Sequence, residues 1–298
     1  MSNPHLQERL KYAKEQLEIG NYGRVTRAAN ELIDSNDPEF LKDGLLYKGM
    51  SLSFQGNTSE AIDYFNQAID TFPDFQFAYF YRLESLVNRR QLEEAKADAA
   101  KLIELDETNV LYYEKLAAIE LELGNMDVIE EICEKVLSME PDNTTFTSIL
   151  ANLHFDEKKF QSAIDHYKKI EASEDFERID QAPIYRRIGF GYLKLEDYTP
   201  AKSYLDKGLE LNPNDPLAIA YLGYALTHLD EVDKGVDLIN DSIDMAPNNS
   251  YAYLLLAKVA IVLNETEDAI ECLDLAQEHD TLEKLGEEIE ELRKVIKV

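Results

Sequence analysis

Residues 182–215 read APIYRRIGFGYLKLEDYTPAKSYLDKGLELNPND, and residues 216–249 read PLAIAYLGYALTHLDEVDKGVDLINDSIDMAPNN. The second stretch repeats the small and apolar positions of the first at one fixed interval, the one that separates Gly189 from Gly223. A segment that repeats such residues at a fixed interval is a structural unit copied in tandem. The two stretches therefore predict a repeat architecture.

The same interval extends in both directions from Pro213 and Pro247, with short insertions before the second and sixth units. Within each unit the apolar residues fall at helical spacing in two blocks separated by a short turn, which is typical of a helix pair. We therefore predict an all-α chain in which one array covers residues 6–283. Its repeats are expected to begin near Leu6, Lys42, Gln76, Val110, Thr144, Ala182, Pro216 and Ser250.

Small residues recur at matching places on both predicted helices of a repeat. Gly189 and Gly223 lie on first helices, whereas Ala201 and Gly235 lie on second helices. Small side chains at facing positions let two helix backbones approach closely, so a larger side chain there should overpack the crossing. We expect these positions to be the points where the two helices of a repeat cross.

The residues at fixed places in the best-defined unit carry a family resemblance. They are Tyr185, Ile188, Gly189, Tyr192, Ala201, Leu205 and Pro213. Their order and spacing resemble the tetratricopeptide repeat. The resemblance implies a right-handed α-α superhelix, or solenoid, of about eight helix pairs. It is weaker in the third repeat, where Arg82 and Leu83 replace the apolar residue and glycine of the pattern.

After Glu283 the repeat pattern does not restart. Leu285, Ile289, Leu292 and Ile296 instead form one apolar stripe at helical spacing. We interpret residues 284–298 as a capping helix that covers the apolar end of the last repeat. The alternative is a helix face that binds another chain.

The charge of the chain argues against some classes of partner. The chain has 298 residues and a formal net charge of -29. Phosphate backbones and anionic membranes would be repelled, so we expect no nucleic-acid binding. No apolar run approaches the roughly 18–20 residues of a membrane-spanning helix, and the first residues lack the apolar core of a secretory signal. We therefore expect a cytoplasmic protein without membrane insertion.

Residues that usually carry catalysis do not cluster in the sequence. The five histidines form no HExxH motif, and Cys133 and Cys272 are far apart along the chain. No glycine-rich phosphate loop and no GxSxG motif is present. His154 and His166 fall in different helices of one repeat, and we interpret them as packing or surface residues. The sequence thus predicts no enzyme activity, no cofactor and no metal site.

The resemblance implies that the first helices of successive repeats line a concave groove that binds peptides. The residues at places that commonly face this groove are Met50, Phe54, Phe77, Phe80, Asn152, Arg186, Phe190, Lys194, Tyr224 and Tyr251. Arg186, Phe190 and Lys194 follow one another at intervals of four and so share one helix face. The two cations could bind a carboxylate of a partner, or they could neutralise neighbouring acids. The aromatic residues could bind a partner or pack between repeats.

These observations predict a non-catalytic scaffold or adaptor whose groove binds a peptide or helix of a partner protein. The net charge favours a basic or apolar ligand for most of the groove. The carboxylate clamp of co-chaperone members is not expected, because Phe190 stands where that clamp has an asparagine and no three successive repeats supply its residues. The alternative function is a structural subunit that associates with copies of itself as a homo-oligomer.

Overall fold

The computed structural model describes residues 3–281 and 285–296. Within these residues the secondary structure is helical and contains no strand, so the predicted all-α class is confirmed. No helix in this part of the chain has the length and apolar character that crossing a bilayer requires. Contacts divide the chain into an N-terminal unit of residues 1–141 and a C-terminal unit of residues 142–298. The single array over residues 6–283 therefore stays a prediction.

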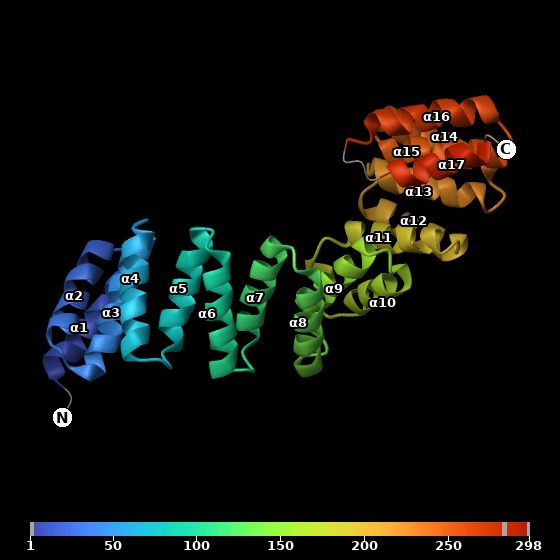
Figure 1. Cartoon of the computed structure of the whole chain (residues 1–298). Coiled ribbons are helices and arrows are strands. Elements are labelled where there is room, and N and C mark those ends of the chain that lie inside the picture. The colour runs from blue at the N-terminus through green and yellow to red at the C-terminus, as the bar shows by residue number, and fades with distance from the viewer. Residues whose placement is uncertain (1–2, 282–284, 297–298) are drawn as a thin grey trace. The chain divides into compact units, whose positions relative to one another are not determined.

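The N-terminal unit consists of helix pairs, which Figure 1 shows in chain order from blue to green. Its helices are α1 (Pro4–Glu18), α2 (Tyr22–Asp34), α3 (Pro38–Phe54), α4 (Thr58–Thr71), α5 (Gln76–Asn88), α6 (Leu92–Leu105), α7 (Val110–Leu123) and α8 (Met126–Met139). Each helix packs on the next one along the chain, and the first helices α1 and α3, and α3 and α5, also meet.

Phe65 of α4 is one of the largest fully buried side chains of this unit. It is 0% exposed, and its ring stacks on Tyr81 of α5 with 6.3 Å between the ring centres. On the facing helix, a Cβ added to Gly49 of α3 would lie 2.4 Å from the ring. The glycine therefore leaves the space that the phenylalanine fills, and this pair joins α3 and α4 to the next repeat.

The C-terminal unit has the same construction. Its helices are α9 (Thr144–Asp156), α10 (Phe160–Glu171), the short 3-10 helix η1 (Phe176–Arg178), α11 (Gln181–Lys194), α12 (Tyr198–Leu211), α13 (Pro216–Thr227), α14 (Val232–Met245), α15 (Ser250–Val262), α16 (Thr266–His279) and α17 (Gly286–Ile296). The insertion before the sixth repeat contains η1, whose Phe176 is buried against Tyr185 of α11. The last helix, α17, packs on α15 and α16.

Two glycines determine how closely α13 and α14 approach. A Cβ added to Gly223 would lie 2.6 Å from the backbone oxygen of Gly235, and a Cβ added to Gly235 would lie 2.6 Å from the backbone oxygen of Gly223. Neither position can hold a methyl group without movement of the backbone. The two helices therefore touch through their main chains, at the residues where the sequence predicts a crossing.

Gly223→Ala should lower the free energy of unfolding of the C-terminal unit by about 1–3 kcal/mol, because the helices must move apart. Gly208→Ala is the matched control. Gly208 is also buried in a helix, but its Cβ would meet Ala182 and Tyr185 at an ordinary 3.5 Å, and alanine is the better helix former by about 1 kcal/mol. Denaturant unfolding of the two variants tests the difference, and equal stabilities would contradict the close crossing.

Candidate functional site

A cavity of about 180 Å³ opens along the first helices of three successive repeats in the C-terminal unit. Its aromatic and basic lining residues are Phe190 and Lys194 of α11, Tyr198 of α12, Tyr221 and Tyr224 of α13, and Tyr251 and Lys258 of α15. Phe190, Tyr224 and Lys258 follow one another at the repeat interval and so occupy the same place in their repeats. The stacking of the repeats therefore turns one repeat position into a row of side chains.

The aromatic rings form a continuous surface in this cavity. The ring centre of Phe190 lies 4.8 Å from that of Tyr221 and 6.4 Å from that of Tyr251. Tyr221 is buried, whereas Phe190, Tyr224 and Tyr251 are half-buried. Burial, followed by the charges of neighbouring groups, raises the pKa of Tyr224 to about 12, so its hydroxyl stays neutral and can donate a hydrogen bond at neutral pH.

Two ammonium groups lie beside these rings. The Nζ of Lys194 is 5.4 Å from the ring centre of Phe190, and the Nζ of Lys258 is 5.9 Å from that of Tyr224. Both ammonium groups contact Glu288, whose Oε1 lies 3.2 Å from Lys194 and 2.5 Å from Lys258. The side chains of Lys194, Lys258 and Glu288 are 30%, 20% and 31% exposed, so the three charges are partly withdrawn from water.

Burial and charge act on these groups in opposite directions. Burial lowers the pKa of the Lys194 ammonium, against the raising effect of Glu288. Burial alone would raise the pKa of the Glu288 carboxyl, but the hydrogen bonds and charges of Lys258 and Lys194 bring that pKa below its ordinary value. The two desolvated lysines therefore favour an ionised carboxylate between them.

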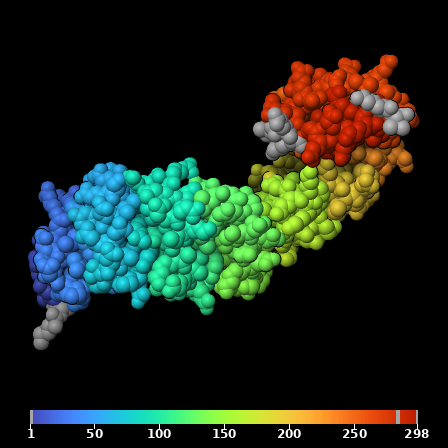
Figure 2. Space-filling model, viewed as in Figure 1, coloured from blue at the N-terminus to red at the C-terminus, as the bar shows by residue number. Residues whose placement is uncertain are grey.

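Glu288 is brought to the cavity by α17. Leu285 and Ile289 are each 1% exposed and pack among residues of α15 and α16 that include Leu254 and Leu273. The predicted capping helix is thus confirmed over Gly286–Ile296, whose atoms are drawn in red in Figure 2. The remainder of the prediction, at residues 284, 297 and 298, lies outside the described residues.

Arg186 does not join the two lysines, although the sequence places it on the same helix face as Lys194. Its guanidinium lies 2.5 Å from the carboxylate of Asp215. Asp215 also accepts hydrogen bonds from the backbone N–H groups of Leu217 and Ala218, each at 3.1 Å, and so caps the N-terminus of α13. Arg186 therefore neutralises the acid that caps the first helix of the next repeat, which is one of the two roles that the sequence left open for this cation.

Sequence-family models of the tetratricopeptide repeat match residues 43–74 and residues 182–215. The first match lies in the N-terminal unit, and the second covers the repeat that carries Phe190 and Lys194. The chain contains tetratricopeptide repeats. Its cavity is therefore built from the first helices of tetratricopeptide repeats, where the resemblance places a groove.

Curated proteins resemble this tetratricopeptide-repeat chain at low identity. The human DnaJ homolog subfamily C member 7 is 23% identical over 257 residues, which cover 80% of this chain and 50% of that protein. A TPR repeat-containing protein of Borreliella burgdorferi is 35% identical over 96 residues, which cover 28% of this chain and 42% of that protein. The chain spans about half the length of the curated relatives that it matches.

The fold also resembles that of solved structures. The structure of Naa15/Naa10 bound to HypK-THB matches with a TM-score of 0.62 and 14% sequence identity, over 91% of this chain and 41% of that chain. At this identity the likeness concerns the fold alone. It agrees with the all-α tetratricopeptide-repeat architecture that the helix pairs show.

The groove residues predicted in the N-terminal unit differ in their accessibility. Met50 is 6% exposed and packs in the core, so its side chain is not open to a partner. Phe54 and Phe77 are 53% and 62% exposed. Phe80 is half-buried, and the Nζ of Lys115 lies 5.8 Å from its ring centre. Position in the tetratricopeptide repeat therefore places these residues on the first helices but does not give their depth.

The structure brings together four of the predicted residues, Phe190, Lys194, Tyr224 and Tyr251. Asn152 of α9 instead accepts hydrogen bonds from Tyr167 at 2.7 Å and from Arg187 at 2.6 Å. The prediction omitted Tyr221 and Glu288. Lys258 is among the residues that the repeat interval places in the groove, since it follows Tyr224 by the same spacing that separates Phe190 from Tyr224.

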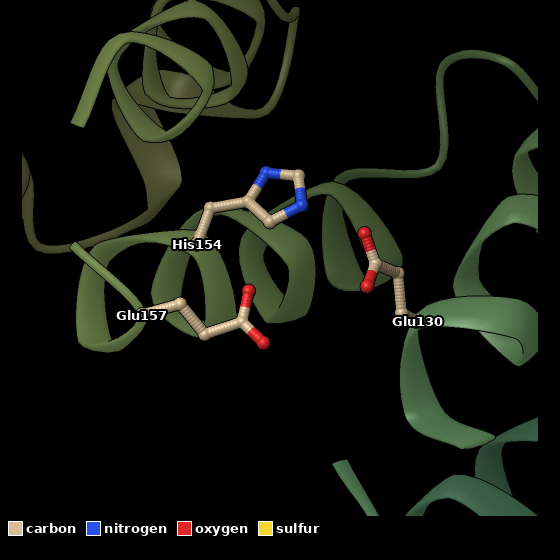
Figure 3. A group of neighbouring side chains, drawn as sticks. All are labelled: Glu130, His154 and Glu157. Carbon is tan, nitrogen blue, oxygen red and sulfur yellow. The ribbon is translucent and has the colours of Figure 1, made fainter. Parts of the chain in front are cut away.

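His154 and Glu157 lie at the C-terminal end of α9, and Figure 3 shows their side chains projecting from it. Their potential ligand atoms are within 4.8 Å of each other. The ring of His154 also lies 5.2 Å from that of His166 in the same repeat. Glu130, the third residue labelled in Figure 3, belongs to the N-terminal unit.

Proposed function

We propose that the chain is a non-catalytic interaction scaffold whose C-terminal unit binds a peptide or helix of a partner protein in the cavity of α11, α13 and α15. The observation that carries this proposal is the row formed by Phe190, Tyr224 and Lys258, which repeats one position in three successive repeats. A segment that runs across the repeats can place a side chain against each member of such a row. We also propose that residues 6–283 form one array.

Aromatic side chains suit such a site for a physical reason. Their rings are large and have few rotatable bonds, so they offer contact area at a low cost in conformational entropy. Phe190, Tyr221 and Tyr251 already hold one another in place through their ring contacts. A partner side chain that enters the cavity therefore meets a pre-organised apolar surface, with ammonium groups of Lys194 and Lys258 beside it.

The comparisons support the class of function but not its details. The solved structure of Naa15/Naa10 bound to HypK-THB is a complex of several proteins, and a scaffold role for this chain is in keeping with that likeness. The human DnaJ homolog is matched over 50% of its length. We therefore transfer no partner from it, and the choice of partner rests on the residues of the cavity.

Phe190→Ala should weaken the binding of peptides that are selected on the full chain from a random twelve-residue display library. We expect a loss of about tenfold or more, because truncating a central aromatic anchor typically costs about 2 kcal/mol. Phe77→Ala is the matched control, since it removes a 62% exposed ring from the other unit and should leave the affinity unchanged. Titration calorimetry on both folded variants measures the effect. An equal loss in both variants, or none in either, would count against this cavity.

Self-association is favoured by a separate observation. Phe54 and Phe77 are large apolar side chains that the N-terminal unit leaves 53% and 62% exposed, and exposed apolar surface often marks an interface. Light scattering over a range of protein concentrations separates the two functions. A dimer that survives dilution and that Phe77→Ala dissociates would favour an assembly subunit over a scaffold for other proteins.

A further inference from the structure

Glu288 differs from the other acids of α17. Glu287, Glu290 and Glu291 are exposed on the same helix, as expected for the solvated face of an amphipathic helix. The carboxylate of Glu288 instead reaches the two ammonium groups of the cavity, at 3.2 Å from Lys194 and 2.5 Å from Lys258. One carboxylate of the last helix therefore occupies the basic end of the candidate binding site.

The rest of the cavity remains open beside this carboxylate. Glu288 is one of its lining residues, and about 180 Å³ of space continues from it along Phe190, Tyr224 and Tyr251. A carboxylate held between two cations, at the end of a partly filled aromatic row, is the arrangement that a bound acidic residue of a partner would adopt. Here the same chain supplies the carboxylate.

We propose that Glu288 is an internal stand-in for an acidic residue of a partner, and that the cavity takes an acidic segment of another protein when Glu288 leaves Lys194 and Lys258. This inference rests on the function proposed above and specifies the partner and the regulation of that site. The part of α17 that carries Glu288 then acts as a displaceable, self-inhibiting ligand.

The charge of the cavity selects for an acidic partner. When Glu288 is withdrawn, the described lining residues retain one acid, Glu196, and two lysines, Lys194 and Lys258. A basic or neutral segment would leave at least one desolvated ammonium group without a carboxylate, and an unpaired buried charge is costly. An acidic segment replaces one carboxylate with another. The chain as a whole, with its net charge of -29, should attract basic partners. The cavity, in contrast, prefers an acidic segment.

The anchoring of α17 is consistent with displacement. The helix has 11 residues, and isolated helices of this length are marginal in water, so tertiary contacts must hold it. Among the described residues, its fully buried anchors are Leu285, directly before the helix, and Ile289 in its first turn. A partner that supplies both a carboxylate and an apolar side chain can replace the ion pairs of Glu288 with the two lysines. Its apolar side chain also contacts the aromatic rings of the cavity, which Glu288 leaves open.

Binding of defined peptides to the full chain tests the proposal. The probe is a fluorescein-labelled twelve-residue peptide of alternating glutamate and phenylalanine, and its counterpart has glutamine in place of glutamate. Glu288→Gln should bind the glutamate peptide about tenfold more tightly than the unchanged chain does, because the competing charged hydrogen bonds are weakened. Glu290→Gln is the matched control, with the same charge change on an exposed residue of the same helix, and should have no effect.

Lys258→Met should weaken binding of the glutamate peptide by about tenfold or more, with or without Glu288→Gln. Hydrogen exchange should show α17 losing protection when the glutamate peptide binds the unchanged chain.

The proposal would be overturned if the Glu288→Gln variant bound the glutamate peptide no more tightly than the unchanged chain does. If the glutamine peptide binds as well as the glutamate peptide and Phe190→Ala weakens both, the scaffold function survives and this inference fails. If neither peptide and no library peptide binds, both fail.

Discussion

Phe65→Ala should lower the free energy of unfolding of the N-terminal unit by about 3–5 kcal/mol, the range for deleting a buried aromatic side chain. Phe65 is 0% exposed, and its ring fills the space beside Gly49 and stacks on Tyr81 of the next repeat. The glycine has no side chain that could move into the cavity left by the ring. The decrease in the free energy of unfolding should therefore lie at the upper end of this range. The adjacent repeat, which contains Tyr81, should also be destabilised.

Phe77→Ala is the control for this substitution. The same chemical change at a side chain that is 62% exposed should alter the stability by no more than about 0.5 kcal/mol. Denaturant unfolding and hydrogen exchange of the two variants measure the difference. If Phe65→Ala cost as little as Phe77→Ala, the packing of α4 between α3 and α5 would be wrong.

The helix pairs could be predicted from the sequence because their contacts are local and repeat. Gly189 and Gly223 recur at the repeat interval, and at each position an added Cβ would lie 2.6 Å from an atom of the paired helix. The constraint acts between two helices joined by a short turn. The spacing of small residues within one repeat therefore predicts where the two helices of that repeat cross. The same spacing in the other repeats supports the prediction.

The depth of the groove residues could not be predicted in this way. Met50 and Phe54 are four residues apart on α3, yet they are 6% and 53% exposed. Phe54 is the last residue of the helix and lies against Tyr22 of α2, whereas Met50 packs in the core. The exposed fraction of a side chain depends on which neighbouring helices cover its position. The repeat pattern indicates only on which face of its own helix the residue lies.

The role of Glu288 was also beyond the sequence. Its neighbours Glu287 and Glu290 are acids of the same type, and the apolar stripe of α17 does not tell them apart. Only the packing of α17 on α15 and α16 decides which of its acids turns toward Lys194, from which Glu288 is separated by 94 positions along the chain. A contact of this kind depends on the rotation and placement of a whole helix.

Arg82 shows a departure from the repeat pattern that the structure explains. The sequence makes the third repeat look weak, because Arg82 stands where the pattern has an apolar residue. In the structure its guanidinium donates two hydrogen bonds to Asp98 of α6, at 2.8 Å and 2.5 Å, and a third to Asn66 of α4 at 2.6 Å. The side chains of Arg82 and Asp98 are 21% and 3% exposed. A buried ion pair thus replaces apolar packing between α5 and its neighbours.

Asp98→Leu should therefore lower the free energy of unfolding by about 3 kcal/mol, because it leaves the guanidinium of Arg82 without a carboxylate in a largely buried place. Burial raises the pKa of the Asp98 carboxyl even though the hydrogen bonds and charge of Arg82 lower it, so desolvation outweighs the pairing at this residue. The double variant Arg82→Leu/Asp98→Leu should recover most of the loss, because both buried charges are gone.

The exposed pair of Lys101 and Glu104 on the same helix α6 provides the comparison. Glu104 is 69% exposed and lies 2.8 Å from Lys101, and Glu104→Ala should change the stability by less than about 1 kcal/mol, as for other surface ion pairs. A denaturant double-mutant cycle on Arg82 and Asp98 measures the coupling. If the double variant were less stable than Asp98→Leu alone, the explanation by an unpaired guanidinium would be wrong. Arg82 would then stabilise the fold through its hydrogen bond to Asn66 and its own packing.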